Sequence, residues 1–578
     1  MRVTSSKSRN SESFYINQSY IDKNGKNTSR NYRKLGTLKE LSEKLGTDRD
    51  GVLAWCREEC RRETARLKAE NETVSISLSP SLPIRKDTGR EVYCGELFLD
   101  CLLRDMKFKN IFRNIDSRHK YQFNLFNITR DLIAARVICP GSKLSTYATV
   151  QKFIEPPKYE LEDVYRALSV LAEESDYIQA ETYRSSNLIH PRNQTVLYYD
   201  CTNYYFEIEQ EDEIRRYGKS KENRPNPIIG MGLFMDADGI PLAFDIHPGN
   251  QNEQLTLKPL EKKVIRDFDC SKFIYCSDSG LGSEDNKQFN DIEGRAYVIT
   301  QSLKKMKAEY RDTALNTSQY RALGSRKFID LKDLDENDPS VFNTIYYKEI
   351  PYGSSRLPDQ RLIVTYSPKY RAYQEKIRSG QITRACRMID EKGKIKSGRR
   401  NLNDPARFIT TTHTDSNGEV TTDSVSIIDQ DIIDNEKMYD GYYAVVTDIE
   451  ADVSEIIAIN QRRWEIEECF RIMKTEFKAR PIYLSREDHI KAHFLICFLA
   501  LLVYRLLEAK LGSKYTAENL IDTLGSMRLV DVEGQGYIPA YTRTDLTDDL
   551  HSLLGFRTDT QIIRKSKMRS ILKQIHDR

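Results

Sequence analysis

The alternation of short β-rich runs with helix-like segments between residues 194 and 300 most constrains what this chain can fold into. Five runs are rich in β-branched and aromatic residues and are expected to form strands: Val196–Tyr199, Ile228–Phe234, Pro241–Ile246, Phe273–Cys276 and Ala296–Ile299. Asp236–Gly239 reads as a hairpin turn between the second and third runs. Helices are expected from about Glu253 to Phe268 and near Ser283–Phe289. Three antiparallel strands followed by two helix–strand units predict an α/β layer with a mixed sheet.

The regions around this layer have different patterns. Residues 1–75 predict a β-hairpin with Asn24-Gly25 as its turn, followed by helices, the first capped by Thr37 with Glu40 at the capping-box spacing and ended by Gly46. Residues 77–90 are rich in Ser and Pro and predict a linker. Residues 92–190 show helical periodicity, residues 301–450 mix strand-like runs with a basic stretch, and a long helical region is expected from about 452 to 510.

Composition excludes several classes of protein. Apolar residues make up 39% and charged residues 30%, which fits a soluble globular protein with an ample core. The longest apolar run, Phe494–Tyr504, is about half the ~20 residues that a membrane span needs, so we expect a buried helix, no membrane association and a cytoplasmic location. Eleven scattered cysteines argue against a disulfide scaffold, and Cys56 and Cys60 lack the second pair of a zinc site.

Charge is balanced overall but uneven along the chain. The formal net charge is only +3, yet residues 366–400 hold eleven Lys/Arg against three Asp/Glu, and residues 560–578 hold six against one. Such patches suit a nucleic-acid binder, because bound cations release counterions from phosphates. A solvated surface is the alternative for each patch alone.

Three acidic residues could carry chemistry. Asp200 and Asp278 follow predicted strands, although Asp at such places also commonly starts a turn. On a helix through residues 460–474, with Arg463 taken as zero, Glu467 lies at about +40° and Lys474 at about +20°. The apolar stripe of this helix would pack on the sheet: Ile466, Phe470, Met473 and Phe477. An ordinary surface pair between Arg463 and Glu467 is the alternative.

Together the three carboxylates could bind divalent metal. Mg²⁺ prefers oxygen ligands, and two ions about 4 Å apart would assist phosphodiester exchange. Arg463 and Lys474 would then hold neighbouring phosphates.

Several motifs in order resemble the DDE transposases of bacterial insertion sequences, in the group with a Tyr-x2-Arg-x3-Glu-x6-Lys signature. Arg463, Glu467 and Lys474 match the spacing, and Asn460 stands where the tyrosine belongs. Other matching segments are residues 199–206, 277–280 with 283–286, 217–221 with 224–225, 247–250, 439–443, 480–483 and 489–493. The resemblance covers about residues 190–510, with weaker echoes at Gly95-Glu96-Leu97 and Pro140-Gly141-Ser142-Lys143.

The resemblance implies a multidomain α/β protein with an RNase-H-like mixed sheet, flanking helices, a β-rich insertion and a mostly helical N-terminal region. The expected parts are 1–75 (hairpin and helices, a candidate DNA-binding region), 92–190 (helical), 191–300 (first catalytic part), 301–450 (insertion), 451–511 (last catalytic part) and 512–578 (basic C-terminal region). Asp200, Asp278 and Glu467 would be the catalytic residues and ligands of two Mg²⁺ ions, with Mn²⁺ as a substitute. Glu468 points about 100° away and ranks second. The expected DNA contacts are Arg463, Lys474, Arg471, Lys219, Lys221 and Arg224.

The resemblance therefore implies a transposase that binds terminal inverted repeats, cleaves DNA with metal and joins it to a target. Its partners would be double-stranded DNA, at element ends and target, and a second copy in a homodimer on DNA. It would act at the nucleoid of a bacterium or archaeon. A metal-dependent endonuclease, or a transposase-derived DNA-binding protein that does not cut, stays open as an alternative.

Three weaker signals favour ordinary structural roles. Gly218-Lys219-Ser220 resembles the end of a phosphate-binding loop, but Glu213 stands where the earlier glycine is required. His489 and His493 have metal-ligand spacing but are expected to pack or cap, because Ile490 breaks the metalloprotease pattern. Trp464 is expected in the core.

Overall fold

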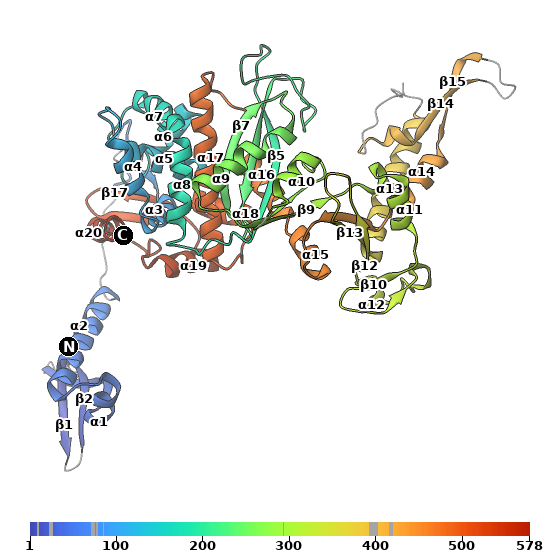
Figure 1. Ribbon diagram of the computed structural model, residues 1–578. Coiled ribbons are helices and arrows are strands. Elements are labelled where there is room, and N and C mark those ends of the chain that lie inside the picture. The colour runs from blue at the N-terminus through green and yellow to red at the C-terminus, as the bar shows by residue number, and fades with distance from the viewer. Residues whose placement is uncertain are drawn as a thin grey trace. The chain divides into compact units, whose positions relative to one another are not determined.

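The computed structural model describes residues 1–8, 11–21, 27–70, 76, 79–81, 83–84, 86–292, 294–391, 403–414 and 420–578. Contacts divide the chain into two compact units, Met1–Thr88 and Gly89–Arg578 (Figure 1). The finer boundaries expected from the sequence stay predictions.

The first unit is a three-stranded antiparallel sheet followed by two helices: β1 (Arg2–Ser8), β2 (Ser11–Ile21), β3 (Asn27–Thr37), α1 (Leu38–Leu45) and α2 (Arg49–Glu70). A small core of Phe14, Leu41, Val52 and Cys56 joins the sheet to the helices. The prediction of a hairpin followed by helices missed β1, whose sequence is mostly Ser and Lys and lacks the apolar alternation of a strand. The expected turn at Asn24-Gly25 lies outside the described residues.

The predicted capping box at the start of α1 is confirmed. The Thr37 hydroxyl accepts a hydrogen bond from the Glu40 N–H at 3.3 Å, and the Glu40 carboxylate accepts one from the Thr37 N–H at 2.8 Å. Gly46 ends the helix at φ +60°, a left-handed conformation that glycine adopts without a Cβ clash.

The second unit is organised by a ten-stranded sheet of order β11-β10-β12-β13-β16-β9-β8-β5-β6-β7. Its strands are β5 (Val196–Tyr205), β6 (Ile228–Met235), β7 (Pro241–Pro248), β8 (Phe273–Ser277), β9 (Arg295–Thr300), β10 (Tyr320–Ala322), β11 (Phe328–Ile329), β12 (Tyr346–Tyr352), β13 (Gln360–Tyr366) and β16 (Tyr442–Thr447). β5, β6 and β7 are antiparallel, whereas β8 runs parallel to both β5 and β9. The predicted mixed sheet is confirmed.

Helices make the parallel connections possible, because parallel neighbours need a crossover. α9 (Leu257–Asp267) leads from β7 to β8, and α10 (Glu284–Asn290) leads from β8 to β9, as the sequence predicted. Single-turn 3₁₀ helices also occur: η1 (Glu253–Leu255), η2 (Leu303–Lys305), η3 (Leu331–Asp333) and η4 (Pro405–Phe408).

The region from 301 to 450 adds strands to this sheet instead of forming a separate layer, because β16 pairs with both β9 and β13. Its other elements are α11 (Ala308–Leu315), α12 (Pro339–Phe342), α13 (Pro368–Asp390), α14 (Gln430–Lys437) and a two-stranded sheet of β14 (Ile409–Thr414) and β15 (Val420–Ile428). Most of the basic stretch is the long helix α13, held by a buried ion pair between Arg378 and Asp440. Figure 1 shows β14 and β15 within the second unit at the end away from α4–α7.

The other helices before residue 527 are α3 (Glu96–Asp105), α4 (Phe108–Asp116), α5 (Leu125–Ile138), α6 (Lys143–Val150), α7 (Leu161–Glu173), α8 (Ser175–Ser186), α15 (Val453–Gln461), α16 (Trp464–Thr475), α17 (Glu487–Lys510) and α18 (Ala517–Ser526). α15, α16 and α17 contact β9, β5 and β7 of the sheet, whereas α3, α5 and α7 pack against α17. The helical region expected from 452 to 510 is thus three helices. Alternate residues of β5 enter two cores, with Tyr198 and Tyr204 on the side of these helices and Tyr199 and Cys201 on the side of α9.

α17 is the central helix of the larger core and packs against α5, α7 and β7. By length and composition it could cross a membrane, but 94% of its apolar window is buried inside the protein. A core helix of a soluble protein passes the same test, so the expected buried helix is confirmed and the membrane signal is weak.

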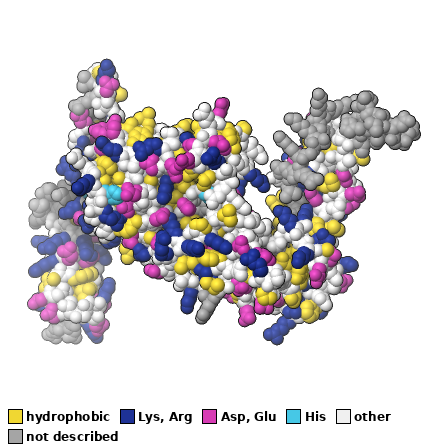
Figure 2. All heavy atoms as spheres, turned by 45° about the horizontal axis from the view of Figure 1, so that its top comes forward, with side chains coloured by type: hydrophobic (Ala, Val, Ile, Leu, Met, Phe, Trp, Pro, Cys, Tyr) yellow, Lys and Arg dark blue, Asp and Glu magenta, His cyan; other side chains and the backbone are white. Residues whose placement is uncertain are grey.

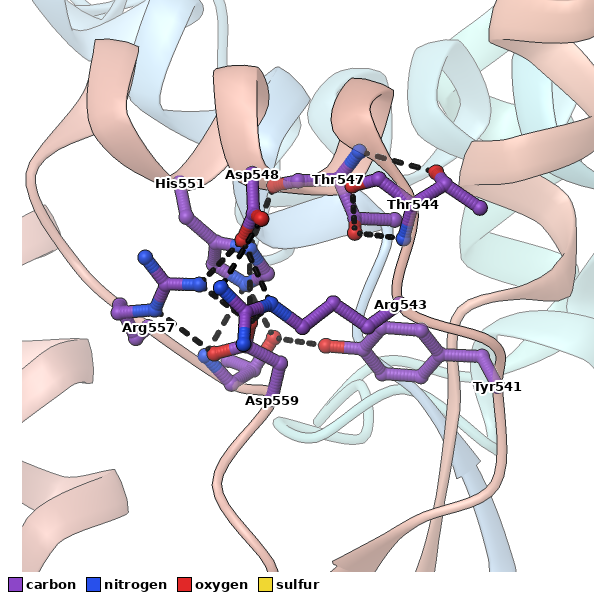
Figure 3. Close-up of polar contacts among 9 residues, drawn as sticks. Tyr541, Arg543, Thr544, Thr547, Asp548, His551, Arg557 and Asp559 are labelled. Carbon is purple, nitrogen blue, oxygen red and sulfur yellow. Dashed lines mark hydrogen bonds and ion pairs between the residues drawn. The ribbon is translucent and has the colours of Figure 1, made fainter.

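The C-terminal region is folded onto the second unit. β4 (Glu91–Tyr93), β17 (Arg528–Val532), β18 (Gly536–Pro539) and β19 (Ile563–Arg564) form a four-stranded sheet beside α19 (Asp545–Leu554) and α20 (Lys565–His576). Around α19, Arg557 binds Asp559 and Asp548, and buried His551 contacts the Thr558 hydroxyl at 3.0 Å (Figure 3). The basic segment 560–578 therefore contains a docked helix, with Met568, Ile571 and Ile575 buried.

Candidate active site

One face of β5 lines the candidate site. Along a strand, every second side chain points the same way, so Tyr198, Asp200, Thr202 and Tyr204 share a face. The Tyr198 hydroxyl donates to the Ile459 carbonyl of α15 at 2.9 Å, and the Tyr204 hydroxyl contacts the Met473 sulfur of α16 at 3.8 Å. α15 and α16 therefore lie over this face, with Asp200 and Thr202 between the two contacts.

The register of β5 and β8 brings the two aspartates together. The last parallel pair is Tyr198 with Cys276, and Asp200 and Asp278 each come two residues later. Asp278 follows the end of β8, as expected, and its carboxylate accepts the Gly280 N–H at 2.9 Å. The expectation that Asp200 also follows a strand end is wrong. β5 continues to Tyr205 because β6 pairs with it past the point where β8 turns away.

Burial and charge perturb Asp200. Burial raises the pKa of its carboxyl to about 6, and the nearby Asp278 carboxylate adds to the rise, although Lys221 and Arg463 oppose it. The rise is therefore mainly an effect of burial, and the neighbouring Asp278 carboxylate contributes to it.

Arg463 connects both aspartates to Glu467. It directly precedes α16, and its Nη2 lies 3.5 Å from the Glu467 Oε1. Burial lowers the pKa of Arg463, but interactions with neighbouring acidic side chains outweigh burial and raise the net value. These side chains are Tyr443, Asp200, Glu467 and Asp278. All three predicted carboxylates therefore act electrostatically on one guanidinium.

The donor set suits a hard divalent cation only in part. Asp200 and Asp278 offer carboxylate oxygens whose mutual repulsion a cation would relieve. Glu467 is 60% exposed and bound to Arg463, and among the described residues no group of three or more His, Cys, Asp or Glu is placed to hold a metal ion. The aspartates fit the cation, and Glu467 would have to leave Arg463 to join them.

Lys474 contacts the same face of β5 at Thr202, two residues after Asp200. Its Nζ donates to the Thr202 hydroxyl at 2.6 Å and lies 3.7 Å from the Glu222 carboxylate. Burial and the charge of Lys221 lower the pKa of Lys474, Asp200 opposes them, and the net value is about 8. Glu222 was not anticipated, although its neighbours Lys221 and Arg224 belong to a segment that resembles the family.

The rest of α16 follows the predicted faces. All four residues of the apolar stripe are buried: Ile466, Phe470, Met473 and Phe477. Glu468 lies 3.7 Å from Arg505 of α17, away from the aspartates, which agrees with its lower rank. Arg471 was expected to contact DNA, but it pairs with Glu468 and Glu476 and is not brought to the carboxylates.

The three basic residues of the β5–β6 loop differ in position. Lys221 donates to the Cys201 carbonyl and lies 3.8 Å from Glu253, close enough to Asp200 to affect its pKa. The Arg224 guanidinium lies over the Tyr205 ring, 4.8 Å from its centroid. Lys219 is exposed. Only Lys221 adjoins the carboxylates.

A groove of about 390 Å³ opens beside Glu467. Its lining includes Arg463, Tyr443, Asn460 and Trp464. The expectation that Trp464 lies in the core is wrong, because it is 58% exposed at the start of α16. The sequence did not predict this groove, since its walls come from β13, β16, α15 and α16.

Basic side chains are dispersed over the surface in view. Figure 2 shows Lys and Arg intermixed with Asp and Glu on that face.

Comparison with known proteins identifies the class. A sheet carrying paired carboxylates beside a helix with Arg, Glu and Lys is an arrangement suited to phosphodiester chemistry. Residues 191–503, more than half of the chain, match the family model described as "Transposase DDE domain". The chain therefore belongs to the DDE transposase family, whose members cleave and transesterify DNA.

Two further comparisons were made. A solved structure titled "Cryo-EM structure of piggyBac transposase synaptic complex with hairpin DNA (SNHP)" is similar at 10% sequence identity, with a TM-score of 0.36 over 84% of this chain and 86% of that one. No curated protein matches significantly.

Proposed function

We propose that this chain is a transposase that binds the terminal inverted repeats of an insertion sequence and catalyses metal-dependent DNA cleavage and strand transfer. One observation carries the proposal: the parallel register of β5 and β8 sets Asp200 beside Asp278, and Arg463, which pairs with Glu467, interacts electrostatically with both aspartates. A surface pair between Arg463 and Glu467 alone would not need the two aspartates beside it.

The catalytic domain is proposed to be RNase-H-like. Support comes from the order β7-β6-β5-β8-β9, in which three antiparallel strands are followed by two parallel additions. In this arrangement Asp200 lies on β5 and Asp278 directly follows the neighbouring β8, and α16 carries Glu467, which would join them after release from Arg463.

Asp200 and Asp278 would hold Mg²⁺, or Mn²⁺ in its place, and Glu467 would complete the ligand set. Two such ions supply charge stabilisation for phosphodiester exchange when they are bound. The chain's own contribution is the buried Asp200 carboxylate beside Asp278, where burial and repulsion both disfavour negative charge that a cation would compensate.

Arg463 and Lys474 would bind DNA phosphates once DNA replaces their present partners. Arg463 would exchange Glu467 for a phosphate, to which its planar fork offers two donors. Lys474 would exchange Thr202 and Glu222 for a neighbouring phosphate as a point charge. Release of Glu467 from Arg463 would couple DNA binding to completion of the carboxylate set.

The reaction has two chemical steps, which are joined by the 3′-hydroxyl that the first step releases at the element end. Water attacks the phosphodiester at the element end, the bond to the 3′ oxygen breaks, and a 3′-hydroxyl is released. That hydroxyl then attacks a phosphodiester of target DNA, and a target 3′-hydroxyl leaves. Because two ends must be joined, we propose a homodimer on DNA, with the first unit and the basic C-terminal region as candidates for end recognition.

The test uses labelled duplexes carrying the inverted repeats that flank this gene, incubated with the full chain and Mg²⁺. Strand joining supports the transposase, whereas nicking alone would favour an endonuclease and a shift without cleavage would favour a binding protein. Asp278→Asn should abolish both steps. Glu468→Gln is the matched control on α16 and should retain them.

A further inference from the structure

A second basic pocket lies outside the carboxylate site. It has a volume of about 330 Å³ and lies between the turn that joins α5 to α6 and the segment before α17. The residues used below line it: Arg136, Lys143, Lys478, Arg480, Tyr483 and His493. The turn includes Pro140-Gly141-Ser142-Lys143, one of the two segments that match the transposase family more weakly.

The lining of this pocket is positively charged. Four of its residues are Lys or Arg, and none of the described residues that line it is Asp or Glu. Two of the cations are deeply buried, since Lys143 is 4% exposed and Arg136 is 3% exposed. Burying a charge is unfavourable unless an opposite charge or hydrogen bonds compensate it.

The contacts of Arg136 fix its guanidinium but do not neutralise it. Nη1 donates to the Phe477 carbonyl at 3.1 Å, and Nη2 donates to the Gly141 carbonyl at 3.1 Å. Its Nε is buried with no hydrogen-bond partner. Both accepting groups are neutral, so the positive charge remains available to an anion.

Lys143 and His493 show the same shortage of negative charge. Burial lowers the pKa of Lys143 to about 7, and the charge of Arg136 contributes. Burial also lowers the pKa of His493, as do Lys143 and Arg136. The His493 Nε2 lies 3.1 Å from the Ala479 carbonyl, so this ring serves in packing, as the sequence suggested, and offers no negative charge.

A chain of ion pairs connects the pocket to the carboxylate site. Arg480 lines the pocket and pairs with Glu222. Glu222 in turn lies 3.7 Å from Lys474, which binds Thr202 of β5. A DNA strand that contacts Lys474 would therefore have this pocket next to its path.

We propose that this pocket is a non-catalytic phosphate-binding site, in which Lys143 and Arg136 hold a phosphate group carried by DNA. A tetrahedral anion offers several acceptors to the two buried cations, and the volume is about ten times the ~30 Å³ that one water occupies in the liquid. That the phosphate comes from DNA rests on the proposed function, whereas the anion site itself does not.

The first test measures thermal stability of the full chain in sodium phosphate and in sodium chloride of equal ionic strength. Phosphate should raise the Tm of the wild type in a saturable way, because a ligand that binds only the folded state stabilises it. Lys143→Met should lose this rise. It should also be at least as stable as the wild type in chloride, since it removes an uncompensated buried charge.

Two further variants support this test. Lys152→Met removes an exposed lysine outside the pocket lining and should keep the full response to phosphate. Lys478→Glu places a negative charge at an exposed position of the lining and should lose the response without disturbing the core. Three results would overturn the proposal. The first is that phosphate does not raise the Tm of the wild type. The second is that it raises the Tm of the wild type and of Lys478→Glu equally, and the third is that Lys143→Met has a lower Tm than the wild type in chloride.

The second test asks whether DNA supplies the phosphate. Single methylphosphonate substitutions, which remove one backbone charge, are placed along an end-sequence duplex. One substitution should weaken binding by the wild type about tenfold and have little effect on Lys143→Met. If the phosphate response holds but no position shows this coupling, the anion site stands and its DNA ligand is rejected. Loss of DNA cleavage would count against the proposed function and not against the pocket.

Discussion

Replacing Asp200 by Asn should make the protein more stable at neutral pH while abolishing DNA cleavage. The native pKa of Asp200 is about 6, compared with 3.8 for an unperturbed Asp. The folded state therefore holds this proton more tightly than the unfolded state. The contribution of protonated Asp200 to the free energy of unfolding is complete below pH 3.8 and is lost as the pH rises through about 6.

The magnitude follows from the difference between the two pKa values. The two pKa values differ by about 2.2, and each pKa unit corresponds to about 1.36 kcal/mol. At pH 7.5 the free energy of unfolding of the wild type is therefore about 3 kcal/mol lower than it would be with a neutral side chain at position 200. Asn is neutral, and its oxygen can still accept the Cys201 N–H that the Asp200 carboxylate accepts at 2.7 Å. Asp200→Asn should thus gain up to about 3 kcal/mol at pH 7.5 and less than about 1 kcal/mol at pH 4.

Urea denaturation of wild type and variant at these two pH values measures the difference, with Asp359→Asn as an exposed control that should change little. Added Mg²⁺ should reduce the difference in unfolding free energy between wild type and Asp200→Asn at pH 7.5, because it would stabilise the wild type alone. A variant less stable than the wild type at pH 7.5, or a gain of the same size at pH 4, would refute the reasoning about Asp200.

Three other predictions follow from the site and the sheet. Glu467→Gln should lower cleavage by more than about 100-fold in a labelled-DNA assay with unchanged Tm, since Glu467 is 60% exposed. DNA affinity measured by fluorescence anisotropy should fall as the pH rises through about 8, because Lys474 then loses its charge; Lys474→Met should bind more weakly and lack this step. Arg378→Met should destabilise the second unit by about 3–5 kcal/mol in urea, and the double variant with Asp440→Leu should recover most of the loss.

The local structure followed from local sequence. Short runs rich in β-branched and aromatic residues predicted the first strands of the sheet, and Thr37 and Glu40 predicted the start of α1. The apolar stripe that begins at Ile466 predicted the buried face of α16. These features depend on interactions within a few residues or on burial of one face, and both are visible in the order of amino acids.

Pairing between distant strands could not be read in the same way. β16 joins β9 to β13, so strands expected in an insertion extend the main sheet. β6 pairs along β5 as far as Tyr205, which places Asp200 inside a strand. These backbone hydrogen bonds join strands that are far apart in the chain, and neither strand's own sequence shows which partner it pairs with.

The sequence by itself determined which residues could do chemistry, and the motifs around Asp200, Asp278 and Glu467 pointed to the transposase family before any fold was known. Only the tertiary structure decided which charges meet. It paired Arg463 with Glu467 within the electrostatic reach of both aspartates, paired Arg471 elsewhere, exposed Trp464, and gathered Arg136 and Lys143 in a pocket without a described acidic residue in its lining. The physical reason is that electrostatic energy depends on distance in space and on burial, and both are set by packing between segments far apart in the chain.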